Sequence, residues 1–242
     1  MQIFGGIKRD GTDLGGANSR GSSLYLGSTG VLNTTAAGSR ISLHGSQDVD
    51  VYMPIVAGGS IGASGITWAG EGSAVTITAG QQIFLDAPIQ AAAAITLKLG
   101  TPAADDNARN LIMTTASGLT AAGLGANNTG STIRMESPGD LDIPANILSG
   151  GTIVQTFSDS GELLAEDYTW SGRDSTIEIV AGGRVLVGTD TVDANGNPAR
   201  KGSFLRASAS VSISAGSDAN GQGIVVYPNG GITASNESGA IS

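Results

Sequence analysis

Residues 75–95 read VTITAGQQIFLDAPIQAAAAI, and the spacing of the apolar residues in this stretch indicates the fold. After Val75, isoleucine or leucine follows at offsets 2, 8, 10, 14 and 20. The same offsets carry apolar residues in two further copies, which begin at Ile41 and Ile133. A fourth copy begins at Ile177 and loses the pattern at offset 14. A spaced pattern that returns in this way is typical of a structural repeat.

The spacing also predicts what each repeat looks like. Apolar residues two apart lie on one face of a strand, whereas gaps of six and four residues require the chain to turn. Each repeat should therefore form three short strands in a lap of about 20 residues, with equivalent strands of successive laps paired in parallel. The sequence predicts an all-β fold, a single-stranded parallel β-helix or solenoid with roughly nine to eleven laps.

Glycine residues are expected at the corners where a lap restarts. Small residues and Gly-Gly pairs or near-pairs follow the last apolar position of several laps, at 57–61, 149–153, 181–185 and 229–232. A tight corner that brings two backbones together tolerates few residues other than glycine. These four segments are therefore predicted corners.

The repeat indicates that residues 1–242 form one β-helix segment rather than two domains. Residues 58–72 are expected to form a shorter lap. Polar or glycine-rich stretches predict surface excursions near 101–110, 155–174, 189–202 and 217–223. In the excursion at 155–174, a turn lies between apolar residues, and we expect a short hairpin there.

Composition excludes several classes of function. The net charge of −9 opposes binding to nucleic acid, and the 12 basic residues form no patch suited to a membrane surface. Without an apolar run of about 18 residues, no membrane insertion is expected. The first six residues do not form a signal peptide, so a targeting segment for an exported protein would lie outside this chain. The absence of cysteine excludes disulfides and thiolate zinc sites.

The histidine and the paired carboxylates are the candidate catalytic groups of this sequence. His44 is the only histidine and has no Gly-x-Ser-x-Gly motif beside it, so we expect an outward surface residue. Asp48 and Asp50 should face solvent about 7 Å apart, a separation at which two carboxyls can act on a glycosidic bond. Asp140 and Asp142 recur at the same repeat offsets, which favours a structural consensus. We therefore predict no catalytic residues and no enzymatic activity.

Residues 193–197 read DANGN and offer oxygen ligands at alternate positions, as the start of a calcium-binding loop does. The remainder of a calcium loop is missing, because Phe204 stands where a bidentate glutamate is needed. Ordinary turn chemistry explains this segment better. The sequence predicts no metal and no cofactor.

Aromatic residues offer the best candidate binding site. Tyr168 and Trp170 alternate along a predicted strand, and Phe157 belongs to the same excursion at 155–174. An exposed aromatic pair can stack on a sugar ring. The alternative is that these residues cover the cap of a hairpin over the stack. We predict binding at Phe157, Tyr168 and Trp170.

Residues 175–187 fit the pattern Ser-x-Ile-x-Ile-x-Ala-Gly-Gly-x-Val-x-Val, with variants at 73–85 and 131–143. These laps resemble the repeats of filamentous-haemagglutinin-like bacterial exoproteins of the two-partner secretion, or type Vb, group. The resemblance covers roughly residues 22–232. Irregular lap lengths and the long insertions depart from a uniform shaft repeat.

This resemblance implies a right-handed β-helix that leaves the cell unfolded through an outer-membrane transporter and folds at the cell surface. The expected role is that of a structural or adhesive shaft segment of a larger secreted exoprotein, mediating adhesion or presenting distal domains. Its partners would be host or neighbouring cell surfaces, including glycans. The alternative is a carbohydrate-active β-helix, either a polysaccharide lyase or hydrolase or a phage tailspike segment.

Overall fold

The computed structural model describes residues 1–5, 22–62, 65–100, 111–157, 163–170, 174–188, 203–217, 220–228, 230–235 and 240–241. Side chains at 4–5, 22–23, 128, 153–167 and 240–241 lie outside this description. The described part is all-β apart from one short 3-10 turn at Ala126–Asn128.

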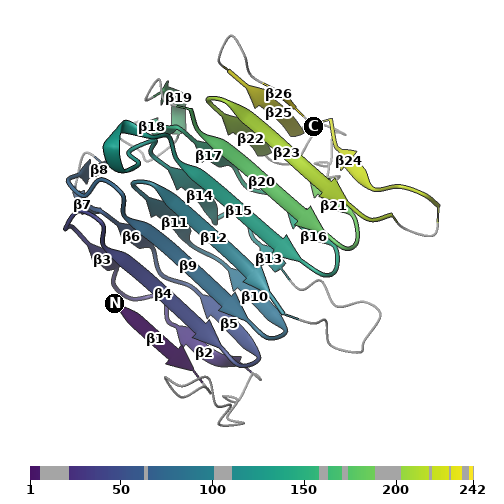
Figure 1. The fold of residues 1–242 in the computed structure, drawn as a ribbon, viewed down its shortest axis with the longest axis horizontal. Coiled ribbons are helices and arrows are strands. Elements are labelled where there is room, and N and C mark those ends of the chain that lie inside the picture. The colour runs from purple at the N-terminus through teal and green to yellow at the C-terminus, as the bar shows by residue number, and fades with distance from the viewer. Residues whose placement is uncertain are drawn as a thin grey trace.

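Three parallel sheets contain most of the strands (Figure 1). The first sheet is formed, in order, by β1 (Gln2–Gly5), β4 (Arg40–Gly45), β9 (Ala74–Ala79), β12 (Ala94–Leu99), β15 (Thr132–Ser137), β20 (Thr176–Ala181), β23 (Ser210–Ala215) and β26 (Ala240–Ile241). The second sheet is formed by β2 (Ser22–Leu26), β5 (Asp48–Val51), β10 (Gln82–Leu85), β13 (Leu111–Met113), β16 (Leu141–Ile143), β21 (Val185–Val187) and β24 (Ile224–Val226). The third sheet is formed by β3 (Leu32–Thr34), β6 (Ile55–Ala57), β11 (Pro88–Ala91), β14 (Gly118–Ala121), β17 (Ile147–Ser149), β22 (Ser203–Ala207) and β25 (Gly230–Ala234).

The chain visits the three sheets in turn, so that β4, β5 and β6 make one lap and β9, β10 and β11 make the next. Each strand pairs in parallel with its equivalent in the neighbouring laps. This topology is compatible with the predicted parallel β-helix. Antiparallel pairing occurs in two hairpins, formed by β7 (Gly59–Gly62) with β8 (Gly65–Trp68), and by β18 (Gly151–Phe157) with β19 (Leu163–Trp170).

The number of laps differs from the prediction of nine to eleven. The second and third sheets each hold seven strands, so the described residues form seven complete laps. Only one interval between first-sheet strands has the expected 20 residues, from Ala74 to Ala94. The interval between Thr132 and Thr176 is 44 residues, because a hairpin is inserted within that lap. Insertions of this kind reduce the number of laps that the chain can complete.

The register of the apolar repeat is confirmed at its first five positions. Ile41 pairs with Val75, and the later positions of the two copies pair in the same way. The sixth position is not equivalent between copies. Ile95 pairs with Ile133 and begins a new lap, whereas Ile61 lies in the hairpin strand β7 with 45% of its surface exposed. The third copy behaves like the first, since its sixth residue falls in β18.

The inward side chains of the three sheets form one continuous apolar core that runs from Ile41 to Ile213. Ile83 is completely buried in this core, while the next residue, Phe84, points outward and is partly exposed. Both orientations follow from the alternation of side chains along a strand. Each fully buried isoleucine, leucine or valine side chain contributes about 1.5–3 kcal/mol to the free energy of folding. These aliphatic side chains fill a narrow core that contains almost no aromatic residues.

The expected hairpin in the excursion at 155–174 is confirmed, and it begins slightly earlier, at Gly151. The short lap expected at 58–72 is wrong, because this segment contains the hairpin of β7 and β8. Both hairpins leave the stack after the third-sheet strand of their lap, and they lie along the same side of the stack (Figure 1). The excursions at 101–110 and 189–202 lie outside the described residues, as does part of 217–223.

Glycine occupies two of the four predicted restart corners in the expected way. Gly58 and Gly150 have positive φ angles of 86° and 92° and connect a third-sheet strand to a hairpin. The third predicted segment is also a tight corner, but it lies within a lap and not at its restart, and the fourth segment is not a corner. Gly182 lies at the corner between the first and second sheets, where a Cβ atom would come within 2.1 Å of the Pro138 carbonyl oxygen. Gly230 and Gly231 lie within strand β25.

Candidate functional site

His44 lies on the outward side of β4 and is partly exposed, as expected. Its ring nitrogen Nδ1 shares a hydrogen bond of 2.6 Å with the hydroxyl of Thr78, its ladder neighbour in β9. Partial burial lowers the pKa of His44 below its usual 6.5. This environment keeps the imidazole neutral and couples it to a ladder neighbour.

Asp48 and Asp50 lie on the outward side of β5, but only Asp48 is partly exposed. The prediction that both carboxylates face solvent is wrong for Asp50, which has 7% of its surface exposed. Tyr25 and Phe84 flank Asp50 in the neighbouring strands, and their bulky rings limit its contact with water. Burial raises the pKa of Asp48, the negative charge of Asp50 raises it further, and a hydrogen bond from the Gln82 backbone partly opposes both effects.

The recurrence of the acidic pair is confirmed by the ladder. Asp50 and Asp142 belong to one row across the second sheet, three laps apart. The second pair has a structural role, because Asp140 binds Arg184 of the following lap. The backbone N–H of Arg184 donates to Asp140 Oδ1 at 2.7 Å, and its guanidinium donates to Oδ2 at 2.9 Å. The two acidic pairs therefore share a repeat position but differ in environment.

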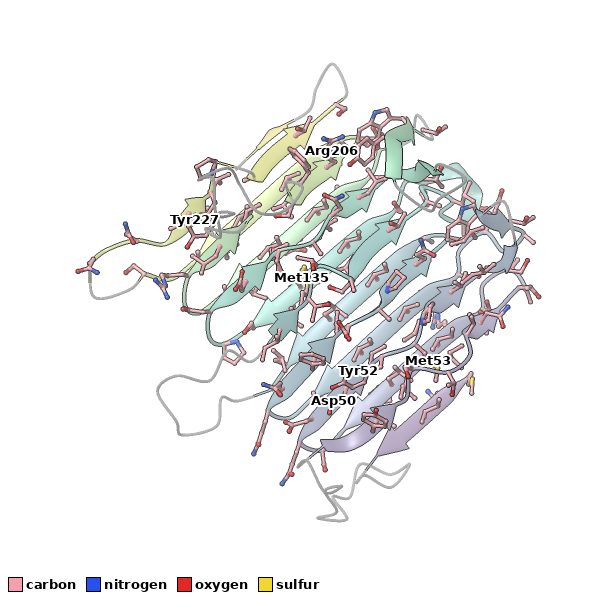
Figure 2. The ribbon with its side chains drawn as sticks, turned by 180° about the vertical axis from the view of Figure 1, so that it is seen from behind. Asp50, Tyr52, Met53, Met135, Arg206 and Tyr227 are labelled. Atoms are coloured by element: carbon pink, nitrogen blue, oxygen red, sulfur yellow. The ribbon has the colours of Figure 1, made fainter. Side chains whose placement is uncertain are left out.

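Three aromatic residues on the outer face of the second sheet lie in contact, and we call them the ring cluster: Tyr25, Tyr52 and Phe84. The ring centroids of Tyr25 and Tyr52 are 5.2 Å apart, and those of Tyr52 and Phe84 are 5.4 Å apart. Tyr25 has 46% of its surface exposed, and the other two residues are partly exposed. Figure 2 shows Asp50 close to Tyr52 near the N-terminal end of the stack. The cluster thus surrounds Asp50 with rings from three successive laps.

Sequence reasoning missed the ring cluster. Its members are at least 27 residues apart in the chain, so no local motif contains them. A signal was nevertheless present, since Tyr25 and Phe84 each stand between two apolar residues of a strand and Tyr52 follows Val51 directly. Aligning the laps by their apolar positions would have placed these rings on one outer face.

The predicted binding residues lie in the second hairpin, and the structure does not bring all three together. Phe157 pairs with Leu163 at one end of the hairpin, whereas Trp170 pairs with Gly151 at the other, about 20 Å away along the strand. The side chain of Phe157 lies outside the described part of the chain. A joint site formed by Phe157 and Trp170 would require these two ends to act on one extended ligand.

Tyr168 lies against the third sheet. The guanidinium carbon of Arg206, in β22, is 3.9 Å from the ring centroid of Tyr168 and 4.3 Å from that of Phe204. The guanidinium group therefore makes a cation–π contact with each of the two rings. One face of the Tyr168 ring is therefore occupied by Arg206, which agrees with the alternative that the hairpin aromatics cover the stack.

The first hairpin is equivalent to the second, and sequence reasoning did not identify it. Trp68 pairs with Gly59 as Trp170 pairs with Gly151. Each hairpin follows a glycine of positive φ. The last two residues of each hairpin begin the same pattern, Thr-Trp-x-Gly-x-x-Ser, at 67–73 and 169–175. This repeated pattern was the missed signal.

The outer face of the first sheet carries a network of ion pairs. Arg134 binds Glu136 of its own strand and Glu178 of the next lap, and Lys98 Nζ lies 3.1 Å from Glu136. Hydrogen bonds from Lys98 and Arg134 lower the pKa of Glu136. Exposed pairs of this kind contribute little stability individually, and they link the ladders of three laps.

Among the described residues, no group of three or more His, Asp or Glu side chains is arranged to hold a metal ion. In the same part of the chain, no helix has the length and apolarity needed to cross a membrane. No protein-family model matches the sequence, and comparisons with curated proteins and with solved structures give no match.

Proposed function

We propose that this chain is a shaft segment of a bacterial cell-surface exoprotein, built as a single right-handed parallel β-helix that mediates adhesion or holds distal domains away from the cell. Export through an outer-membrane transporter, directed by regions outside this chain, belongs to the same proposal. Its partners are the surfaces of host or neighbouring cells. The chain has no enzymatic activity in this proposal.

The observation that carries the proposal is the persistence of the ladder across insertions. Thr132 to Ser137 pair residue by residue with Thr176 to Ala181, although a hairpin lies between the two strands in the chain. The same register is kept across the first hairpin, between β4 and β9. A stack that keeps its core while side elements vary is suited to a rigid support.

The absence of cysteine is in line with export in an unfolded state, because no disulfide has to form before or during transport. Stability then depends on the ladders and the continuous core, which form lap by lap once the chain is outside. Solenoids gain stability from contacts between neighbouring repeats, so folding can propagate along such a chain.

A second candidate function is polysaccharide cleavage, and one observation favours it. Asp48, with its raised pKa, lies beside Asp50 and next to the ring cluster, and glycosidases use a pair of carboxyls with different protonation states. The recurrence of the pair at Asp140 and Asp142, in a different environment, argues for a structural origin. We therefore retain the shaft as the proposed function.

Two measurements test the proposal together. Beads coated with the purified chain should adhere to bacterial or epithelial cells more than beads coated with an unrelated β-helix do. Incubation of the chain with a broad polysaccharide panel should release no new reducing ends or unsaturated products. Turnover that is abolished by Asp48→Asn or Asp50→Asn would replace the shaft by the carbohydrate-active alternative.

A further inference from the structure

We propose that the ring cluster, together with the carboxylates beside it, is a binding surface for neutral glycans. This inference rests on the proposed adhesive function and names the ligand class and the site. It places recognition on the outer face of the second sheet rather than on the hairpin predicted from the sequence.

The rings provide an extended apolar platform. Tyr25, Tyr52 and Phe84 come from three successive laps, and their centroids are spaced at 5.2 and 5.4 Å. Their planes are tilted by 43° and 39°, so the platform is stepped and not flat. Sugar rings present C–H faces that pack on aromatic rings, and successive tilted rings suit successive sugar units.

Carboxylates border this platform and define the charge of its ligand. Asp48 and Asp86 are partly exposed, and Asp86 accepts a hydrogen bond of 2.6 Å from the hydroxyl of Thr114. Asp86 directly follows strand β10, and Tyr52 directly follows strand β5 of the previous lap, so the two residues occupy equivalent positions in neighbouring laps. Carboxylates accept hydrogen bonds from sugar hydroxyls but repel the acidic groups of uronic or sialic acids. The buried carboxylate of Asp50 adds to this repulsion, so the surface disfavours acidic glycans.

The second hairpin is less suited to this role. Arg206 occupies one face of the Tyr168 ring at 3.9 Å and is itself held against Phe204. A sugar stacking on that face would have to displace the guanidinium group. Tyr25 has 46% of its surface exposed on the outer face of the second sheet.

The test uses a glycan array that carries neutral hexose and N-acetylhexosamine oligosaccharides, polygalacturonate and chitosan oligomers. The unaltered chain should bind at least one neutral oligosaccharide. The double variant Tyr25→Ala, Tyr52→Ala should lose about tenfold or more in affinity for it, because two of the three rings that would contact the ligand are removed. Tyr25→Phe with Tyr52→Phe should retain binding, because the rings are kept.

Two variants serve as matched controls. Tyr227 follows the second-sheet strand β24 as Tyr52 follows β5, five laps away from it, so Tyr227→Ala should leave binding unchanged. The double variant Tyr168→Ala, Trp170→Ala should also bind as the unaltered chain does. If Tyr25→Ala, Tyr52→Ala is unfolded by circular dichroism, the single variant Tyr25→Ala replaces it, because Tyr25 is the most exposed of the three rings.

The outcomes separate this inference from the proposed function. Cell adhesion by the unaltered chain without binding to any neutral oligosaccharide overturns the glycan surface and leaves the adhesive shaft in place. Binding restricted to polygalacturonate or to chitosan overturns the neutral class, and binding lost only in Tyr168→Ala, Trp170→Ala returns the site to the hairpin. If neither adhesion nor glycan binding occurs, the adhesive part of the proposed function fails as well. Neutral-glycan binding that is lost in the alanine variant and kept in the phenylalanine variant supports the inference.

Discussion

The hydroxyl oxygen of Ser175 accepts a hydrogen bond of 2.8 Å from the backbone N–H of Ser131, which lies 44 residues earlier in the chain. Both residues are buried, at the corner where the chain enters the first sheet. The side-chain oxygen of Ser73 accepts a hydrogen bond from the backbone N–H of Ser39 in the same way, three lap boundaries earlier in the stack. A buried N–H without a hydrogen-bond acceptor is costly in free energy. The serine side chain of the repeat pattern supplies this acceptor for the backbone N–H at the corner.

We therefore predict that Ser175→Ala destabilises the protein by about 1–3 kcal/mol, because it leaves the buried N–H of Ser131 without an acceptor. Urea unfolding followed by circular dichroism measures the difference. Ser212→Ala is the control, since Ser212 is exposed on the outward side of β23 and should change stability by less than about 0.5 kcal/mol. Equal stability of the two variants would contradict the proposed role of the corner serine.

The orientation of β10 is tested by two adjacent residues. Ile83→Asp would place an unpaired charge in the core and should destabilise the protein by about 4 kcal/mol or more. Phe84→Ser removes an outward ring and should cost about 1 kcal/mol. Thermal melts that rank Phe84→Ser as the more damaging change would mean that the register of the strand is shifted by one residue.

Alanine substitutions at two glycines distinguish the effect of close packing at the hairpin corner from the effect of backbone strain. Gly150 has a φ angle of 92°, and a Cβ atom there would meet Ser208 Oγ at 2.4 Å and Ser175 at 2.8 Å. Gly30 has a similar φ angle of 99° with nothing within 4 Å of the added atom. Both alanine variants carry the strain of positive φ, about 1–2 kcal/mol, but only Gly150→Ala adds the clash. Gly150→Ala should therefore lower the melting temperature more than Gly30→Ala does.

The raised pKa of Asp48 predicts a defined dependence on pH. A carboxyl whose pKa is higher in the folded state adds stability below its unfolded pKa of about 3.8 and loses that contribution as the pH rises through the folded value. Asp48→Asn should therefore raise the melting temperature at pH 7, and the gain should vanish towards pH 3. A constant difference between the variant and the unaltered protein across this range would contradict the account.

The pKa of Glu136 is shifted in the opposite direction from that of Asp48, so its pH dependence should be opposite as well. Lys98 and Arg134 lower its pKa, so its contribution is present above its usual 4.5 and is lost as the pH falls through the folded value. Glu136→Gln should lower the melting temperature slightly at pH 7, and this effect should become smaller as the pH falls below the usual pKa of 4.5. The effect should also shrink in high salt, because the ion pairs are near the surface. A larger effect of Glu136→Gln at pH 3 than at pH 7 would show that the ion pairs do not cause the shift.

The sequence was sufficient to predict the strands that carry the core. Ile41, Val75 and Ile133 begin laps whose first five apolar positions align in the structure, because inward side chains of stacked laps have to meet. The sixth position was misleading. Ile61 matched the offset of Ile95 although Ile61 belongs to a hairpin, since a hairpin strand also places apolar residues at short intervals.

The outer surface was harder to predict, because it depends on contacts between laps of unequal length. Asp50 is buried only because the rings of Tyr25 and Phe84 stand next to it in neighbouring strands. To predict that these residues are ladder neighbours, the exact number of residues in each lap has to be known. The apolar pattern near residues 22–26 is too irregular to give that number for the first lap. Tyr168 was identified correctly as part of a hairpin, whereas its contact with Arg206 depends on how that hairpin folds back on β22.

The central claim is that the laps stack into one rigid parallel ladder, and a distance between two spin labels tests it most directly. Because the chain has no cysteine, Thr76→Cys and Ser212→Cys introduce the only two attachment points. Both residues belong to one outward row of the first sheet, four ladder steps apart. The account predicts a single narrow distribution centred at about 19 Å between the backbones, broadened by the label arms. A broad distribution, or a distance about twice as large, would contradict the stacked ladder.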